Sequence, residues 1–138
     1  MRKRDLISIV EEVKPFQDPK IELEQYTIDA ISAVDIAYIA GFKFDDLRNH
    51  IVFDLGAGTG RLSVAEAYLQ AHQIISVDID MAALTLLKEN IDKLHLGHII
   101  NPLCGDIRNP IFNLKLLKNQ KITTIMNPPF GVQKKSAD

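Results

Sequence analysis

The four residues Asn127-Pro128-Pro129-Phe130 directly follow the apolar run Ile122–Met126. Two consecutive prolines lack backbone N–H groups and fix φ, so they continue neither a strand ladder nor a helix. We therefore expect a rigid, extended corner at the carboxyl end of a strand. The Asn amide oxygen, a proline carbonyl oxygen and an aromatic face of this corner suit a flat heterocycle with an exocyclic amine. A rigid loop without a catalytic role is the alternative interpretation.

A glycine-rich loop, Asp54-Leu55-Gly56-Ala57-Gly58-Thr59-Gly60, is the second candidate site. Glycines allow a tight turn and a close approach of the backbone to a ligand. Asp78 follows another apolar run, where its carboxylate can accept hydrogen bonds from ribose hydroxyls. A dinucleotide fingerprint would need glycine at Arg61, so the spacing favours S-adenosylmethionine, abbreviated SAM. Asp54 could instead be structural and bond the loop amides.

Strands and helices alternate after residue 50, which predicts the fold class. The apolar patterns predict strands at Ile51–Leu55, Gln73–Val77, Ile99–Leu103 and Ile122–Met126, with helices at Arg61–Ala71 and Met81–Leu94. This alternation favours right-handed βαβ units and an α/β, Rossmann-like, doubly wound parallel sheet with helices on both faces. Pro102 indicates an edge position for the third strand.

Two further helices are predicted before the sheet. They span Asp5–Lys14, ended by Pro15, and Ile28–Ala40, ended by Gly41, and Asp45–Asn49 is expected to form a turn. We expect one globular unit, 1–138, with N-terminal helices in 1–45 and a partial SAM-binding domain in 46–138. The fourth predicted strand would leave an open sheet edge. We therefore expect the C-terminal strands of the fold to be missing, or a partner or second copy to cover this edge.

The bulk composition is ordinary for a soluble protein, with 46% hydrophobic and 25% charged residues. No apolar run reaches the roughly 18 residues that span a bilayer, and the basic start lacks a secretory apolar stretch. We therefore expect a cytoplasmic protein. The single cysteine, Cys104, excludes an internal disulfide. It could join His95 and His98 in a metal site, but a fourth ligand with suitable spacing is missing, so no metal is expected.

These motifs resemble the class I SAM-dependent methyltransferases that methylate amino groups. More narrowly, they resemble the small archaeal and eukaryotic RNA N6-adenosine methyltransferases, whose eukaryotic members modify small-subunit rRNA. The resemblance runs from about Lys20 to Asp138. Its narrowest mark is Leu23-Glu24-Gln25-Tyr26, and Asp78-Ile79-Asp80 and the Asn-Pro-Pro-Phe motif with Gly131 accompany it. Gln133 and Asp138 are similar to the archaeal continuation of the last motif.

The resemblance implies SAM as cofactor and a set of residues that contact it. The implied contacts are Gln25, Gly56, Thr59, Asp78, Asp106, Ile107 and Asn127, and the glycine loop adds Asp54, Gly58 and Gly60. The family has one residue between the tyrosine and a cofactor-binding threonine, whereas Thr27 follows Tyr26 directly. Either Thr27 keeps this role or Ile28 replaces it. Asp106 could instead cap the segment that follows it.

The implied reaction is in-line displacement of the SAM methyl group by the N6 amine of an unpaired adenosine in RNA, with rRNA the expected substrate. The catalytic residues would be Asn127, Pro128, Pro129 and Phe130. Asn127 and the Pro128 carbonyl would accept the amine hydrogens, Pro129 would hold the corner, and Phe130 would stack on the base.

Three alternatives remain open at this stage. The same corner also serves methylation of a protein glutamine amide or of the guanine exocyclic amine. The chain could also be a SAM-binding fragment that is inactive without its missing C-terminal part. It could finally act as a scaffold through its open sheet edge, since the eukaryotic family members work with a small zinc-binding activator subunit.

The net charge of −2 gives no general field that would attract nucleic acid.

Overall fold

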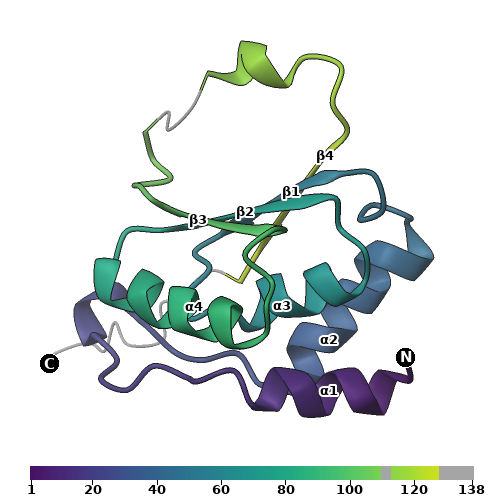
Figure 1. Ribbon diagram of the computed structural model, residues 1–138. Coiled ribbons are helices and arrows are strands. Elements are labelled where there is room, and N and C mark those ends of the chain that lie inside the picture. The colour runs from purple at the N-terminus through teal and green to yellow at the C-terminus, as the bar shows by residue number, and fades with distance from the viewer. Residues whose placement is uncertain (110–112, 128–138) are drawn as a thin grey trace, which may run out of the picture.

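The computed structural model describes residues 1–109 and 113–127. Its centre is a parallel sheet of four strands, β1 (Ile51–Leu55), β2 (Gln73–Asp78), β3 (Ile100–Cys104) and β4 (Ile122–Met126), in the order β3-β2-β1-β4 (Figure 1). β1 and β4 have the predicted bounds, while β2 ends and β3 begins one residue later than predicted. The expected α/β, Rossmann-like fold is confirmed, as is the edge position of the strand that carries Pro102.

The strand order reverses at β1. The chain steps outward from β1 to β2 and β3 and then returns to the other side of β1 to form β4. Leu55, the last residue of β1, pairs with Met126, the last residue of β4. In open α/β sheets, ligands bind outside the carboxyl ends of the strands at such a switch point. The register therefore brings the glycine loop after β1 next to Asn127.

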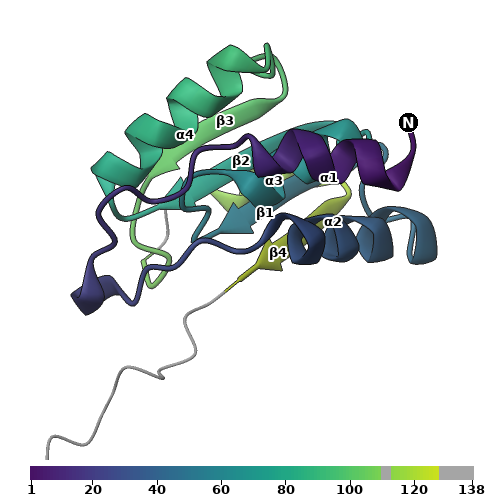
Figure 2. The ribbon, with the colours of Figure 1, turned by 90° about the horizontal axis from the view of Figure 1, so that it is seen from below.

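Four α-helices, α1 (Lys3–Glu11), α2 (Ala30–Tyr38), α3 (Arg61–Tyr68) and α4 (Met81–Lys93), all cover the same face of the sheet (Figures 1 and 2). The prediction of helices on both faces is wrong for the described residues. Among its described residues, the connection from β3 to β4 contains the short 3₁₀ turn Leu114–Leu117 and no α-helix. None of the described helices is long and apolar enough to cross a membrane.

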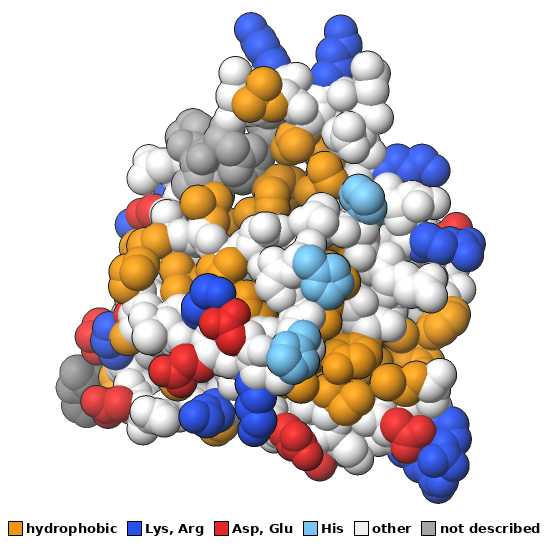
Figure 3. Space-filling model, viewed as in Figure 1, with side chains coloured by type: hydrophobic (Ala, Val, Ile, Leu, Met, Phe, Trp, Pro, Cys, Tyr) orange, Lys and Arg blue, Asp and Glu red, His pale blue; other side chains and the backbone are white. Residues whose placement is uncertain are grey.

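Helices and sheet share one hydrophobic core. From the sheet, Val52, Ile74, Ile100 and Ile125 point towards the helices and belong to this core. The small residues Ala33 and Ala37 of α2 are fully buried and let α2 approach α1 and α3 closely. On the opposite face, Ile122 and Met126 stay 42% exposed. Figure 3 shows further hydrophobic side chains between the sheet and the segment 113–121 that precedes β4.

The predicted end of the second helix at Gly41 is also wrong. α2 continues beyond Tyr38 into a π-helical turn, Ile39–Lys43, which contains Gly41. A Cβ atom at Gly41 would lie 3.2 Å from Leu47 Cδ1, so glycine serves close packing against the fully buried Leu47 rather than termination. The predicted ends of the other helices differ from the observed ones by up to three residues, as expected for frayed helix termini.

Candidate cofactor site and catalytic corner

A cavity of about 410 Å³ lies at the carboxyl ends of β1, β2 and β4. Its size is typical of small-molecule sites. All the predicted cofactor residues that the structure describes line it: Gln25, Thr27, Asp54, Gly56, Gly58, Thr59, Gly60, Asp78, Asp106, Ile107 and Asn127. Of the predicted catalytic residues, Pro128, Pro129 and Phe130 lie outside the described residues.

The backbone of the glycine loop has a left-handed conformation at three positions, which favours glycine there. Gly56, Gly58 and Gly60 all have positive φ, of 74°, 58° and 103°. A Cβ atom at Gly58 would lie 3.1 Å from the ring of Phe16, which packs against the loop from the segment between α1 and α2. Both the conformation and the close ring contact therefore exclude larger side chains at this position.

Asp78 is held at the end of β2 by two backbone amides. Its Oδ2 accepts a hydrogen bond from the Gly58 N–H at 2.8 Å, and its Oδ1 accepts one from the Asp80 N–H at 2.9 Å. Each carboxylate oxygen has a second acceptor position. The carboxylate is therefore oriented towards the cavity with acceptor capacity for the hydroxyl groups of a ligand.

Asp54 is buried beneath the loop. The Ser63 hydroxyl donates to its Oδ2, and the Ser63 and Ser76 hydroxyl oxygens lie 2.7 Å apart. Burial raises the pKa of Asp54 to about 6, although the Ser63 hydrogen bond acts to lower it. The structural role considered for Asp54 was a hydrogen bond to a loop amide. In the structure, Asp78 rather than Asp54 accepts a hydrogen bond from the Gly58 N–H. The contacts of Asp54 thus anchor β1 to α3.

Residues 14–28, here called the strap, contribute to the lining of the cavity and are tied to α4. The Asn90 side chain accepts from the Lys14 N–H at 3.0 Å and donates to the Lys14 and Thr59 carbonyl oxygens. Farther along the strap, Lys20 Nζ and Gln25 Nε2 donate to the two carboxylate oxygens of Asp80 at 2.8 and 2.7 Å. Asp80 also caps α4 through the Ala82 N–H.

Two predicted contact residues are engaged within the protein itself. Thr27 Oγ1 accepts from the Phe16 N–H at 3.1 Å, which closes the strap on itself. Asp106 accepts from the backbone N–H and the guanidinium of Arg108, and these hydrogen bonds lower the pKa of Asp106 to about 2. The capping alternative for Asp106 is therefore observed, while the residue still lines the cavity.

At the other end of the cavity, the Tyr26 hydroxyl donates to Asn127 Oδ1 at 2.7 Å. Asn127 directly follows β4, and Tyr26 comes from the strap. The strap therefore contacts both the N-cap of α4, through Gln25, and the predicted catalytic corner, through Tyr26.

Sequence reasoning missed several residues that build this site: Phe16, Lys20, Arg61, Asp80 and Asn90. In the sequence, Arg61 was considered only because it stands where a dinucleotide fingerprint would need glycine. In the structure, its guanidinium donates to the carbonyl oxygens of Glu11, Val13 and Ile28. Asp80 carried a detectable signal, because an aspartate directly before a helical pattern is a typical N-cap. The described residues contain no group of three side chains suited to bind a metal ion.

Comparison with known proteins identifies the family. The TRM5/TYW2 methyltransferase domain matches residues 43–131. The chain belongs to this methyltransferase family. The expected methyltransferase relationship is thereby confirmed, and the methyl donor of the family is SAM, as the glycine spacing predicted.

Two curated relatives and one solved structure resemble the chain over nearly its whole length. It is 39% identical to "Uncharacterized protein MJ0284" of Methanocaldococcus jannaschii, with 100% of the chain and 63% of that protein covered. It is 35% identical to the "rRNA N(6)-adenosine-methyltransferase METTL5" of Danio rerio, with coverages of 96% and 62%. The crystal structure of "a putative RNA methyltransferase PH1948" from Pyrococcus horikoshii matches with TM-score 0.81 and 36% identity, over 100% of the chain and 63% of that protein. The chain thus spans less than two thirds of these relatives.

Proposed function

We propose that this protein transfers a methyl group from SAM to the N6 amine of an adenosine in RNA, with rRNA as the expected substrate. The observation that carries this proposal is that the glycine loop, Asp78 and Asn127 line one cavity at the switch point of the sheet. The relative from Danio rerio bears the name of an rRNA N6-adenosine methyltransferase, which supports the choice of acceptor.

The residues of the cavity fit SAM. The Asp78 carboxylate has acceptor positions for ribose hydroxyls, the glycine loop offers close backbone approach to the amino-acid tail, and Asp106 with Ile107 would flank the adenine. Apolar side chains such as Ile79 and Met126 also line the cavity and would exclude water from the reacting groups. When bound, SAM supplies an electrophilic methyl group on a sulfonium centre.

The chemical role of the protein is to hold the acceptor amine. An exocyclic adenine nitrogen is a poor nucleophile, because its lone pair is delocalised into the ring. Asn127 Oδ1 would accept one amine hydrogen and the Pro128 carbonyl the other, which draws the nitrogen towards tetrahedral geometry. Phe130 would stack on the base, with a contribution of about 1–3 kcal/mol by analogy with single-strand stacking platforms. Positioning then supplies most of the rate enhancement.

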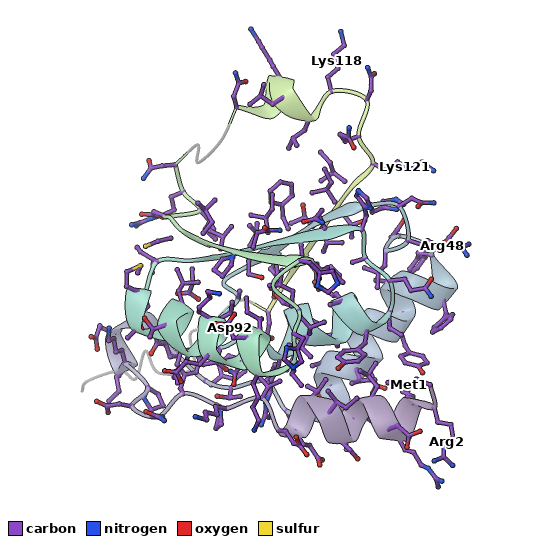
Figure 4. The ribbon with its side chains drawn as sticks, viewed as in Figure 1. Met1, Arg2, Arg48, Asp92, Lys118 and Lys121 are labelled. Carbon is purple, nitrogen blue, oxygen red and sulfur yellow. The ribbon has the colours of Figure 1, made fainter. Side chains whose placement is uncertain are left out.

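The basic side chains labelled in Figure 4 come from separate parts of the described chain. Figure 4 shows Lys118 and Lys121 in the segment before β4, Arg48 in the segment before β1, and Arg2 at the start of α1. The net charge is −2. We therefore expect local phosphate contacts and base stacking, rather than long-range attraction, to determine binding.

The decisive variant is Asn127→Ala. Loss of the amide oxygen should reduce methyl transfer by about 10²-fold or more, while SAM affinity changes modestly. The measurement is tritium transfer from labelled SAM to total RNA, DNA and protein. Asn101→Ala on the exposed edge strand β3 is the matched control and should retain transfer. Unchanged turnover of Asn127→Ala would refute the role of Asn127, and labelling of protein or of guanine would move the acceptor to a glutamine amide or guanine N2.

A SAM-binding protein without turnover of its own is the second candidate function. It is favoured by the open face of the sheet, where Ile122 and Met126 remain exposed. For this candidate function we propose that a partner covers the open face of the sheet, either a small activator subunit or a second copy of the chain. Calorimetric SAM binding without methyl transfer, restored in a longer form of the protein, would establish this candidate, and size-exclusion chromatography would reveal self-association.

A further inference from the structure

We infer that Tyr26 is a positioning residue that holds the side-chain amide of Asn127 in its productive orientation. The inference rests on the proposed function, since it assigns the residue that prepares Asn127 to accept an amine hydrogen.

The supporting contact joins two distant parts of the chain. The Tyr26 hydroxyl donates to Asn127 Oδ1 at 2.7 Å, although 101 positions separate the residues. Both side chains line the same cavity. Tyr26 is 39% exposed, so its ring stands at the open mouth rather than in the core.

This hydrogen bond restrains the position of the Asn127 side chain. An asparagine oxygen has two acceptor positions, so Oδ1 can receive the Tyr26 hydroxyl and still accept one amine hydrogen. Turning the amide by 180° would direct the Nδ2 donors towards the amine hydrogens, and no hydrogen bond could form there. With Oδ1 at the Tyr26 hydroxyl, the Asn127 side chain is held in place with one acceptor position left for the substrate.

The backbone at Tyr26 is itself anchored at the cofactor end of the cavity. The neighbouring Gln25 donates to Asp80 at 2.7 Å, and Gln25 Oε1 accepts from the Lys20 N–H at 2.8 Å. Asp80 is in turn the N-cap of α4. Two consecutive strap residues thus connect the α4 N-terminus with the catalytic corner, which limits how far the Tyr26 hydroxyl can move away from Asn127.

The test is Tyr26→Phe, which removes the hydroxyl and keeps the ring. We expect kcat to fall about three- to tenfold, the effect of losing one neutral hydrogen bond, while KM for RNA and the Kd for SAM stay within about twofold. Tyr38→Phe and Tyr68→Phe, at the two other tyrosines of the chain, are matched controls and should leave kcat unchanged.

A second readout does not depend on turnover. In ¹⁵N-labelled protein, the side-chain amide resonances of Asn127, assigned by their absence in Asn127→Asp, should shift in Tyr26→Phe and not in either control. Unshifted resonances, or a shift with unchanged kcat, would overturn the inference. Shifted resonances in a protein that methylates no acceptor would support the Tyr26–Asn127 contact and refute the proposed function instead.

Discussion

Two pairs of carboxyl groups near the cavity differ in their surroundings. Asp78 and Asp80 at the end of β2 receive hydrogen bonds from backbone amides, and Asp80 also receives them from Lys20 and Gln25. Asp54 and Glu66 lie in the interior between β1 and α3. In the described part of the chain, neither carboxylate oxygen of Glu66 has a hydrogen-bond partner.

The pKa shifts follow this difference. The side chain of Asp80 is only 6% exposed, and its burial acts to raise the pKa, yet the hydrogen bonds from Lys20, Gln25 and Ala82 lower it overall. For Glu66, burial raises the pKa well above its ordinary value, and the neighbouring Asp54 adds to the increase. Burial alone therefore does not decide whether a carboxyl group is charged, because directed donors can outweigh it.

The largest effect that would sharpen this comparison is expected from Asp78→Asn. An asparagine has one acceptor oxygen, so its NH₂ group would face the N–H of either Gly58 or Asp80. We expect SAM affinity to fall about 10- to 100-fold by calorimetry, because the glycine loop and the ribose lose their shared acceptor. Asp92→Asn, at an exposed ion pair on α4 (Figure 4), should bind SAM normally. Equal affinity of Asp78→Asn and wild type would show that the cavity carboxylates do not serve the ligand.

A smaller effect is expected from Asp80→Asn, which removes the ion pair with Lys20 and loosens the strap. SAM affinity should fall about three- to tenfold, chiefly through faster dissociation measured by stopped flow. Because the pKa of Asp80 is lowered, its contribution to stability is present above the unfolded-state value near 3.8 and is lost as pH falls through the lower folded value. Lys20→Met, which removes the same ion pair, should also dissociate from SAM faster. If only Asp80→Asn dissociates faster, the effect comes from loss of the α4 cap alone.

The smallest change is expected in the interior pair, from Glu66→Met. An acid with a raised pKa contributes stability at low pH and loses it as pH rises through its folded value, so Glu66 weakens the fold at neutral and alkaline pH. The variant should increase the free energy of unfolding by about 1 kcal/mol at pH 8 and by less at pH 5, as measured by urea unfolding. SAM affinity should not change. A loss of stability at pH 8 would mean that the charged form of Glu66 is stabilised in the fold.

Local patterns predicted much of the fold and of the cavity lining. β1 and β4 were predicted with the observed bounds, because each is a short apolar run between polar or glycine-rich segments. The glycine loop and Asp78 were placed together, because consecutive parallel strands end at the same edge of a sheet. The end of α2 was not predicted, since Gly41 permits a close contact with Leu47 that depends on the packing of a distant segment.

By itself, the sequence determined the order of strands and helices, the positive-φ loop and the methyltransferase relationship, because these depend on spacing along the chain. Tertiary structure decided which acids are buried without hydrogen-bond donors and which receive them, which face of the sheet the helices cover, and that Tyr26 contacts Asn127. Such contacts join residues 60 to 101 positions apart, as in Lys20–Asp80 and Tyr26–Asn127. Their geometry depends on how the strap lies across the folded sheet, for which no local periodicity carries a signal.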